Sequence, residues 1–212
     1  MILIAGGLLA GTAAGLWLSG NKIIFSASGE PIRNLSQAAD GAEPAHLKGT
    51  SSAVVTIEEF GDFQCPPCSR MHAEMKKLEE EYGSRIQIIY RHYPLSAHGQ
   101  ALEAAQAAEA AALQGKFWEM HDFLFERQEE WSDKSNSREL FTDYARSLRL
   151  DVEKFSKDID SSQVKERIES DKKRADSINV SGTPTLFING REVSSEAMNP
   201  ASIRDMINAA LK

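Results

Sequence analysis

Two cysteines, Cys65 and Cys68, are the only thiols in the 212 residues, and two prolines stand between them. A Cys-X-X-Cys pair can form a reversible disulfide, supply half of a zinc site, or remain chemically inert. A zinc site needs two further ligands. The nearest candidate in sequence is His72, which we expect on the solvated side of its helix. The pattern therefore favours thiol–disulfide exchange over metal binding.

The residues around the pair place it between a strand and a helix. The β-branched run at 54–57 predicts a short buried strand, and apolar residues spaced three and four apart after Cys68 predict a helix. The start of a helix stabilises a thiolate through its free N–H groups and its dipole. We expect Cys65, at the exposed turn, to attack a substrate. Cys68, one turn into the helix, would resolve the mixed disulfide.

The two prolines between the cysteines are predicted to tune the redox potential of the pair. Pro66 fits the first turn of a helix, where a missing N–H costs nothing. Pro67 removes another N–H that could have faced the sulfur of Cys65, and it supplies no side-chain donor. We expect a thiolate less stabilised than it would be with a donor at position 67.

The elements that hold the pair follow the order βαβ, a helical block, then ββα. The boundaries are marked by Gly83 at a helix end, Asp151 as a helix N-cap, the turn pair Asn189-Gly190, and Pro200 at a helix start. We expect the strands of the βαβ unit to be parallel. The elements are expected at 54–57, 68–82, 86–90, about 96–178 for the helical block, 185–188, 191–193 and 200–211.

An uncharged apolar run from Ile2 to Leu18 precedes these elements. As a helix it would span about 25 Å, the low end of what crosses a membrane. Residues 1–20 are therefore predicted to form a hydrophobic helix, either a signal anchor or a signal peptide cleaved near residues 26–28. Residues 21–50 resemble a linker, and residues 51–212 are expected to form the folded domain.

From about residue 54 to the end, the chain resembles the DsbA-like branch of the thioredoxin superfamily. The resemblance rests on Glu-Phe-Gly-Asp-Phe-Gln-Cys-Pro-Pro-Cys at 59–68 and Val-Ser-Gly-Thr-Pro-Thr at 180–185, with supporting runs at 90–95 and 115–118. It implies an α/β thioredoxin fold, with a helical insertion at about 96–178 between the βαβ and ββα halves.

The resemblance also implies roles for residues outside the cysteine pair. Pro184 would be cis and face the cysteines, leaving the backbone of Thr183 free to pair with an extended substrate. Glu59 would be buried beneath Cys68, with a raised pKa that lets it pass protons to or from the resolving thiol. Glu58, the next residue along the strand, should point to the opposite face. At position 67 the strongest oxidants of the family have histidine, so Pro67 is a departure.

These observations predict a protein thiol–disulfide oxidoreductase of the cell envelope, most simply a disulfide donor. Its partners would be protein thiols and disulfides and a membrane or envelope redox protein that recycles the pair. Alternatives are a disulfide reductase or isomerase, or a non-redox adaptor that binds peptides. We expect a monomer, since no separate dimerisation domain is visible.

The net charge and the histidines bear on two other classes of function, nucleic-acid binding and metal binding. A net charge of −7 disfavours nucleic-acid binding. No organic or metal cofactor is implied, and His92, His98 and His121 are interpreted as structural or surface residues.

Overall fold

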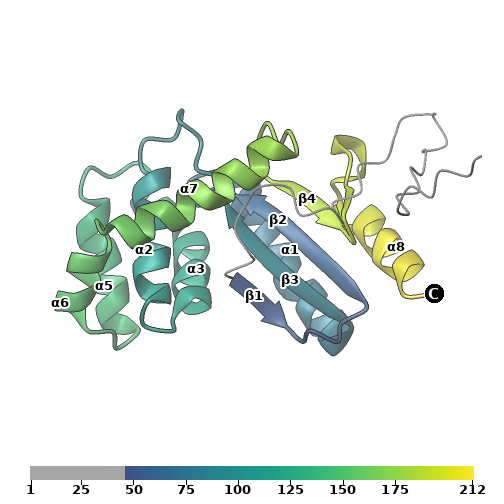
Figure 1. Ribbon diagram of the computed structural model, residues 1–212, viewed down its shortest axis with the longest axis horizontal. Helices are drawn as coiled ribbons and strands as arrows, with labels where there is room; N and C mark the ends of the chain where they lie inside the picture. Colours follow the sequence, from purple (N-terminus) through teal and green to yellow (C-terminus); the bar gives the residue numbers. More distant parts are fainter. Residues whose placement is uncertain (1–45) are drawn as a thin grey trace, which may run out of the picture. The chain divides into compact units, whose positions relative to one another are not determined.

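The computed structural model describes residues 46–212, whose strands form one five-stranded sheet in the order β1-β3-β2-β4-β5 (Figure 1). The βαβ unit consists of β2 (Val55–Gly61), α1 (Pro66–Tyr82) and β3 (Ile86–His92). β2 and β3 are parallel and in register from Val55 opposite Ile86 to Gly61 opposite His92. A 3₁₀ turn at Gly83–Arg85 follows α1, and Gly83 has a φ of 54°. The predicted βαβ unit and the helix end at Gly83 are confirmed.

The second half of the sheet follows the predicted ββα order. β4 (Thr185–Ile188) pairs antiparallel with β2 and with β5 (Arg191–Glu192). Asn189 and Gly190 have φ values of 46° and 76°, as a two-residue type I′ turn requires. A short 3₁₀ turn (Ser195–Ala197) leads to α8 (Pro200–Ala210).

Between these halves lies the expected helical insertion. Figure 1 shows α2, α3, α5 and α6 gathered beside the sheet, with α7 running back from them to the strands. Asp151 caps α6 by accepting a hydrogen bond from the N–H of Lys154, as predicted. The helices are α2 (Ala101–Ala112), α3 (Phe117–Glu126), α4 (Gln128–Trp131), α5 (Ser137–Ser147), α6 (Val152–Asp158) and α7 (Ser162–Ser177).

Apolar side chains fix the layers around the sheet. One cluster joins Ile57 and Ile188 of the sheet to Leu78 of α1 and Ile207 of α8, so these two helices cover the same face. The opposite face buries Phe187, among others, against the end of α7. A third cluster fills the helical insertion and includes both cysteines.

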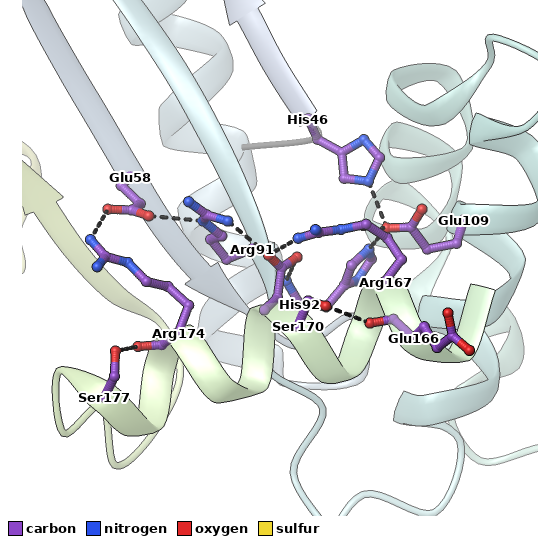
Figure 2. Close-up of polar contacts among 11 residues, drawn as sticks. His46, Glu58, Arg91, His92, Glu109, Glu166, Arg167, Ser170, Arg174 and Ser177 are labelled. Atoms are coloured by element: carbon purple, nitrogen blue, oxygen red, sulfur yellow. Dashed lines mark hydrogen bonds and ion pairs between the residues drawn. The ribbon is translucent and has the colours of Figure 1, made fainter. Parts of the chain in front are cut away.

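A buried polar network ties α7 to the strands beneath it (Figure 2). The guanidinium of Arg91 on β3 donates to Glu58 on β2 at 2.8 Å and to Asp171 on α7 at 3.0 Å. Arg167 also bonds Asp171, and Arg174 lies 3.8 Å from Glu58. Removing one member of such a network would leave a buried charge unpaired, typically a loss of about 3–5 kcal/mol.

The folded domain begins earlier than residue 51. Residues His46–Gly49 form β1, which pairs antiparallel with β3, so the last part of the expected linker belongs to the sheet. The hydrophobic segment at 1–20 and the rest of the linker lie outside the described residues. Among residues 46–212, no helix has both the length and the apolar character needed to cross a membrane.

Gly61 at the end of β2 offers a test of this packing. A Cβ at this position would lie 2.6 Å from the Tyr90 ring and 2.8 Å from its hydroxyl oxygen. We therefore expect Gly61→Ala to lower the free energy of unfolding by about 1–3 kcal/mol, measured by urea denaturation. Gly99→Ala is the matched control, because its Cβ would meet nothing within 4 Å. Equal stability of the two variants would contradict the close approach of Tyr90 to Gly61.

Candidate active site

Both cysteines lie at the start of α1. Cys65 is the N-cap residue, and Pro66 and Pro67 occupy the first two helical positions, where N–H groups have no partner within the helix. The N–H of Cys68 donates to the carbonyl oxygen of Cys65 at 3.0 Å. Cys68 is fully buried, as expected, but Cys65 is also only 4% exposed. The expectation of an exposed Cys65 was wrong, because the helical insertion packs against the turn.

The two thiols have opposite pKa shifts. A hydrogen bond with Cys68 lowers the pKa of Cys65 to about 6 against the effect of burial, and hydrogen bonds with Thr183 and the Cys68 backbone act in the same direction. Burial raises the pKa of Cys68 well above its ordinary value, and its contact with Cys65 and the charge of Glu59 add to this. Near pH 7 the reduced pair therefore holds its negative charge on Cys65.

The loop before β4 meets the cysteines from the other half of the sheet. The Thr183–Pro184 peptide bond is cis, which confirms the prediction. The Sγ of Cys65 lies 3.4 Å from the carbonyl oxygen of Thr183, to which it donates a hydrogen bond when it is a thiol. Thr183 and Pro184 thus lie directly beside the attacking sulfur, and their role in substrate binding remains a prediction.

Glu59 is buried on β2, close enough to both cysteines that its charge interacts with theirs. Burial, together with the charge of Cys65, raises the pKa of Glu59 to about 8. Its Oε1 atom has no hydrogen-bond partner among the described residues. A carboxylic acid that is neutral at pH 7 can donate a proton near the resolving thiol, and the carboxylate so formed can accept one back, so the chemistry predicted for Glu59 is available there.

Asp62 stabilises the turn that carries Cys65. Its Oδ1 accepts a hydrogen bond from the N–H of Gln64 at 2.7 Å, and its Oδ2 accepts from the N–H of Leu95 at 2.9 Å and from His98 at 2.7 Å. No role for Asp62 was predicted from the sequence. Its position directly after a strand and a glycine is typical of an aspartate that hydrogen-bonds the backbone of a turn, and this was the signal available in the sequence.

Gln128 of the helical insertion holds the same turn from the other side. Its side-chain amide donates to the carbonyl oxygens of Phe63 at 2.6 Å and Cys65 at 3.1 Å. Nothing in the sequence near Gln128 indicates this contact, because 63 residues separate it from Cys65.

A groove of about 480 Å³ lies next to Pro67 and Pro184. Met71, Met198 and Ile203 supply apolar surface in it, and Arg70 and Glu74 are its charged residues. Its position beside the cis-proline makes it accessible to a chain that approaches the cysteine turn.

His72 was expected on the solvated side of α1, and this expectation was wrong. Its side chain is 5% exposed, because α3 of the insertion covers this side of α1. Its ring stacks on Phe125 and packs edge-on against His121. His121 and His92 are likewise buried, whereas His98 is partly exposed.

The thioredoxin family model matches residues 42–209. The chain belongs to the thioredoxin family, and its fold is that of the DsbA-like oxidoreductases. A thioredoxin-like oxidoreductase from Silicibacter pomeroyi superposes with a TM-score of 0.65 and 26% identity, over 79% of this chain and 93% of that one. Oxidised BdbD from Bacillus subtilis gives a TM-score of 0.71 at 23% identity, over 82% and 99% of the two chains.

The relatives that resemble the chain in sequence are longer proteins. The Na(+)/H(+) antiporter NhaA 1 of Mycolicibacterium gilvum is 41% identical over 154 residues, which are 70% of this chain and 24% of that protein. NhaA 3 of Salinispora tropica is 38% identical over 79% of this chain and 26% of its own length. The chain thus spans about a quarter of the length of these relatives.

The raised pKa of Glu59 predicts a pH dependence of stability in the reduced protein. Unfolded, this carboxyl releases its proton near pH 4.5, and folded near pH 8, so stability falls as pH rises between these values. Glu59→Gln removes this loss and should be more stable than the natural chain at pH 8 by roughly 1–4 kcal/mol, with little difference at pH 4.

Urea denaturation at the two pH values measures this effect. Glu80→Gln is the control, since it makes the same change at an exposed carboxylate of α1. A Glu59→Gln variant with the pH dependence of the natural chain would show that the carboxyl ionises normally in the fold.

Proposed function

We propose that the chain exchanges disulfides with protein substrates outside the cytoplasm, and most simply donates a disulfide to them. The opposite pKa shifts of Cys65 and Cys68 carry this proposal. A thiolate at Cys65 attacks or leaves readily, whereas the protonated Cys68 stays inactive until a mixed disulfide forms. In disulfide donation, a substrate thiolate attacks Cys65, and Cys68 leaves as a thiolate that must then take up a proton.

The proton for this step has a source in the site. When the Cys65–Cys68 disulfide opens, the sulfur of Cys68 leaves with the electron pair in a fully buried position. Glu59, neutral near pH 7 because of its raised pKa, can protonate it. A second substrate thiolate then displaces Cys65, which leaves as the stabilised thiolate, and the substrate gains the disulfide.

The pKa of Cys65 supports the oxidising direction. A value of about 6 lies between about 7 for thioredoxin and about 3.5 for DsbA. Stabilising the thiolate stabilises the reduced pair and so makes the disulfide more oxidising. We therefore place the reduction potential between about −270 and −120 mV.

The substrate is proposed to be an extended polypeptide. The Thr183–Pro184 loop lies beside the sulfur of Cys65, and the groove at Pro67, Met71 and Met198 continues from it. Backbone pairing at Thr183 would hold the segment, and the groove would accept an apolar side chain. Extracytoplasmic location rests on the apolar run at residues 2–18, together with the persistence of disulfides in oxidising compartments. Because the antiporter relatives match over a quarter of their length, we do not propose ion transport for this chain.

Equilibration of the full chain in glutathione buffers, followed by trapping of free thiols, tests the direction. We expect a potential between about −270 and −120 mV, because of the low pKa of Cys65. A value more reducing than about −270 mV would assign the chain to the disulfide reductases. A pair that forms no disulfide would contradict the redox function and favour a peptide-binding adaptor.

Pro67→His tests whether position 67 sets the potential. A histidine there can stabilise the Cys65 thiolate, so we expect a lower pKa and a more oxidising pair, by about 30 mV for each pKa unit. Thiolate absorbance gives the pKa, and glutathione equilibration gives the potential. Lys77→His, an exposed change on the same helix, is the control. An unchanged potential in Pro67→His would show that backbone and Cys68 contacts alone govern Cys65.

A further inference from the structure

A second group of chemically reactive side chains lies between α1 and α3. His72 of α1 meets His121 and Asp122 of α3, and their ligand atoms all lie within 4.8 Å of one another. The Nδ1 atom of His121 is 3.0 Å from Oδ1 of Asp122, and Nε2 of His72 is 3.8 Å from the same oxygen. Three side chains from two helices therefore converge around one small volume.

The nitrogen of His72 that faces this volume is unsatisfied. Its Nε2 atom is buried and has no hydrogen-bond partner among the described residues, in a side chain only 5% exposed. Buried polar groups almost always have a partner, so such an atom points to something that completes its coordination.

Separation and access fit a small cation. Ligands of a tetrahedral zinc ion, at about 2.0–2.1 Å from the metal, lie about 3.3 Å from one another, between the two distances observed here. The side chain of Asp122 is 26% exposed, which gives an ion a path from solvent. Glu126 lies 4.0 Å from Nε2 of His72 but pairs with Lys76 at 2.6 Å. Glu126 is therefore not counted among the ligands.

A second cluster of similar composition is less suited to a cation. His46 and His92 both direct Nε2 at one oxygen of Glu109, at 2.6 and 2.8 Å, as Figure 2 shows. These hydrogen bonds lower the pKa of Glu109 to about 2, although burial opposes them. Arg167 lies 4.0 Å from the same oxygen, and its positive charge would repel a metal ion. Two imidazoles already hydrogen-bond this carboxylate oxygen.

We propose that His72, His121 and Asp122 bind one divalent transition-metal ion, zinc by their chemistry. The site is separate from the redox pair and does not depend on the proposed function. It revises the expectation that the chain holds no metal and that its histidines are only structural.

Zinc titration of the full chain tests the site. The Cys65–Cys68 disulfide is kept oxidised so that its thiols cannot bind the metal, and calorimetry with zinc chloride gives stoichiometry and affinity. We expect one zinc per chain and a rise in melting temperature. Asp122→Asn and His72→Gln should each weaken binding by more than about tenfold and abolish the rise, since even outer-shell changes cost about 10–100-fold.

His46→Gln is the matched control, because it removes a buried histidine from the other cluster. It should bind zinc with the affinity of the natural chain. If His72→Gln fails to fold by circular dichroism, Asp122→Asn, a change of one atom at a partly exposed site, still decides the result. Absence of zinc binding, binding unaffected by Asp122→Asn, or binding lost only in His46→Gln would each overturn the proposal.

Discussion

The pairing of β2 with β4 is the constraint on which the redox site depends. Cys65 and Thr183 are 118 residues apart, and their contact follows from the register that sets Ile57 opposite Ile188 and Phe60 opposite Thr185. β2 ends at the cysteine turn, so the residues that precede β4 must pass that turn. A slip of one residue would turn every side chain of β4 to the other face. The apolar cluster shared by α1 and α8 therefore stabilises the geometry of the site.

This geometry brings together three ionisable groups, Cys65, Cys68 and Glu59, at a site that favours only one negative charge. Burial raises the pKa values of both Glu59 and Cys68, and the negative charge of Cys65 acts on both in the same direction. Charging a second member would place two like charges close together where water is excluded. The hydrogen bond with Cys68 has the largest effect on which member carries the charge, and it favours Cys65. The division of labour between attacking and resolving thiol thus arises from the protein environment, because the two side chains are chemically identical.

Sequence reasoning succeeded where local signals determine the structure. The βαβ unit, the turn at Asn189-Gly190, the cap at Asp151 and the helical insertion each follow from spacing or turn chemistry within a few residues. It failed where burial depends on distant partners. β1 has four residues and exists through its pairing with β3, and His72 is buried by a helix about fifty positions further along. The contact of Gln128 with the cysteine turn and the pairing of Arg91 with Asp171 are likewise long-range and have no local signature.

The helical insertion affects more than the size of the domain. It closes one side of the cysteine turn, where Gln128 holds the carbonyl of Cys65 and the backbone of Ser132 accepts a hydrogen bond from Gln64. It also covers the α3-facing side of α1, where the imidazoles of His72 and His121 are buried against each other. The groove at Pro67 and Ile203 lies toward α8, away from this cover. Cys65, only 4% exposed, thus lies between the helical insertion and the Thr183–Pro184 loop that its sulfur contacts.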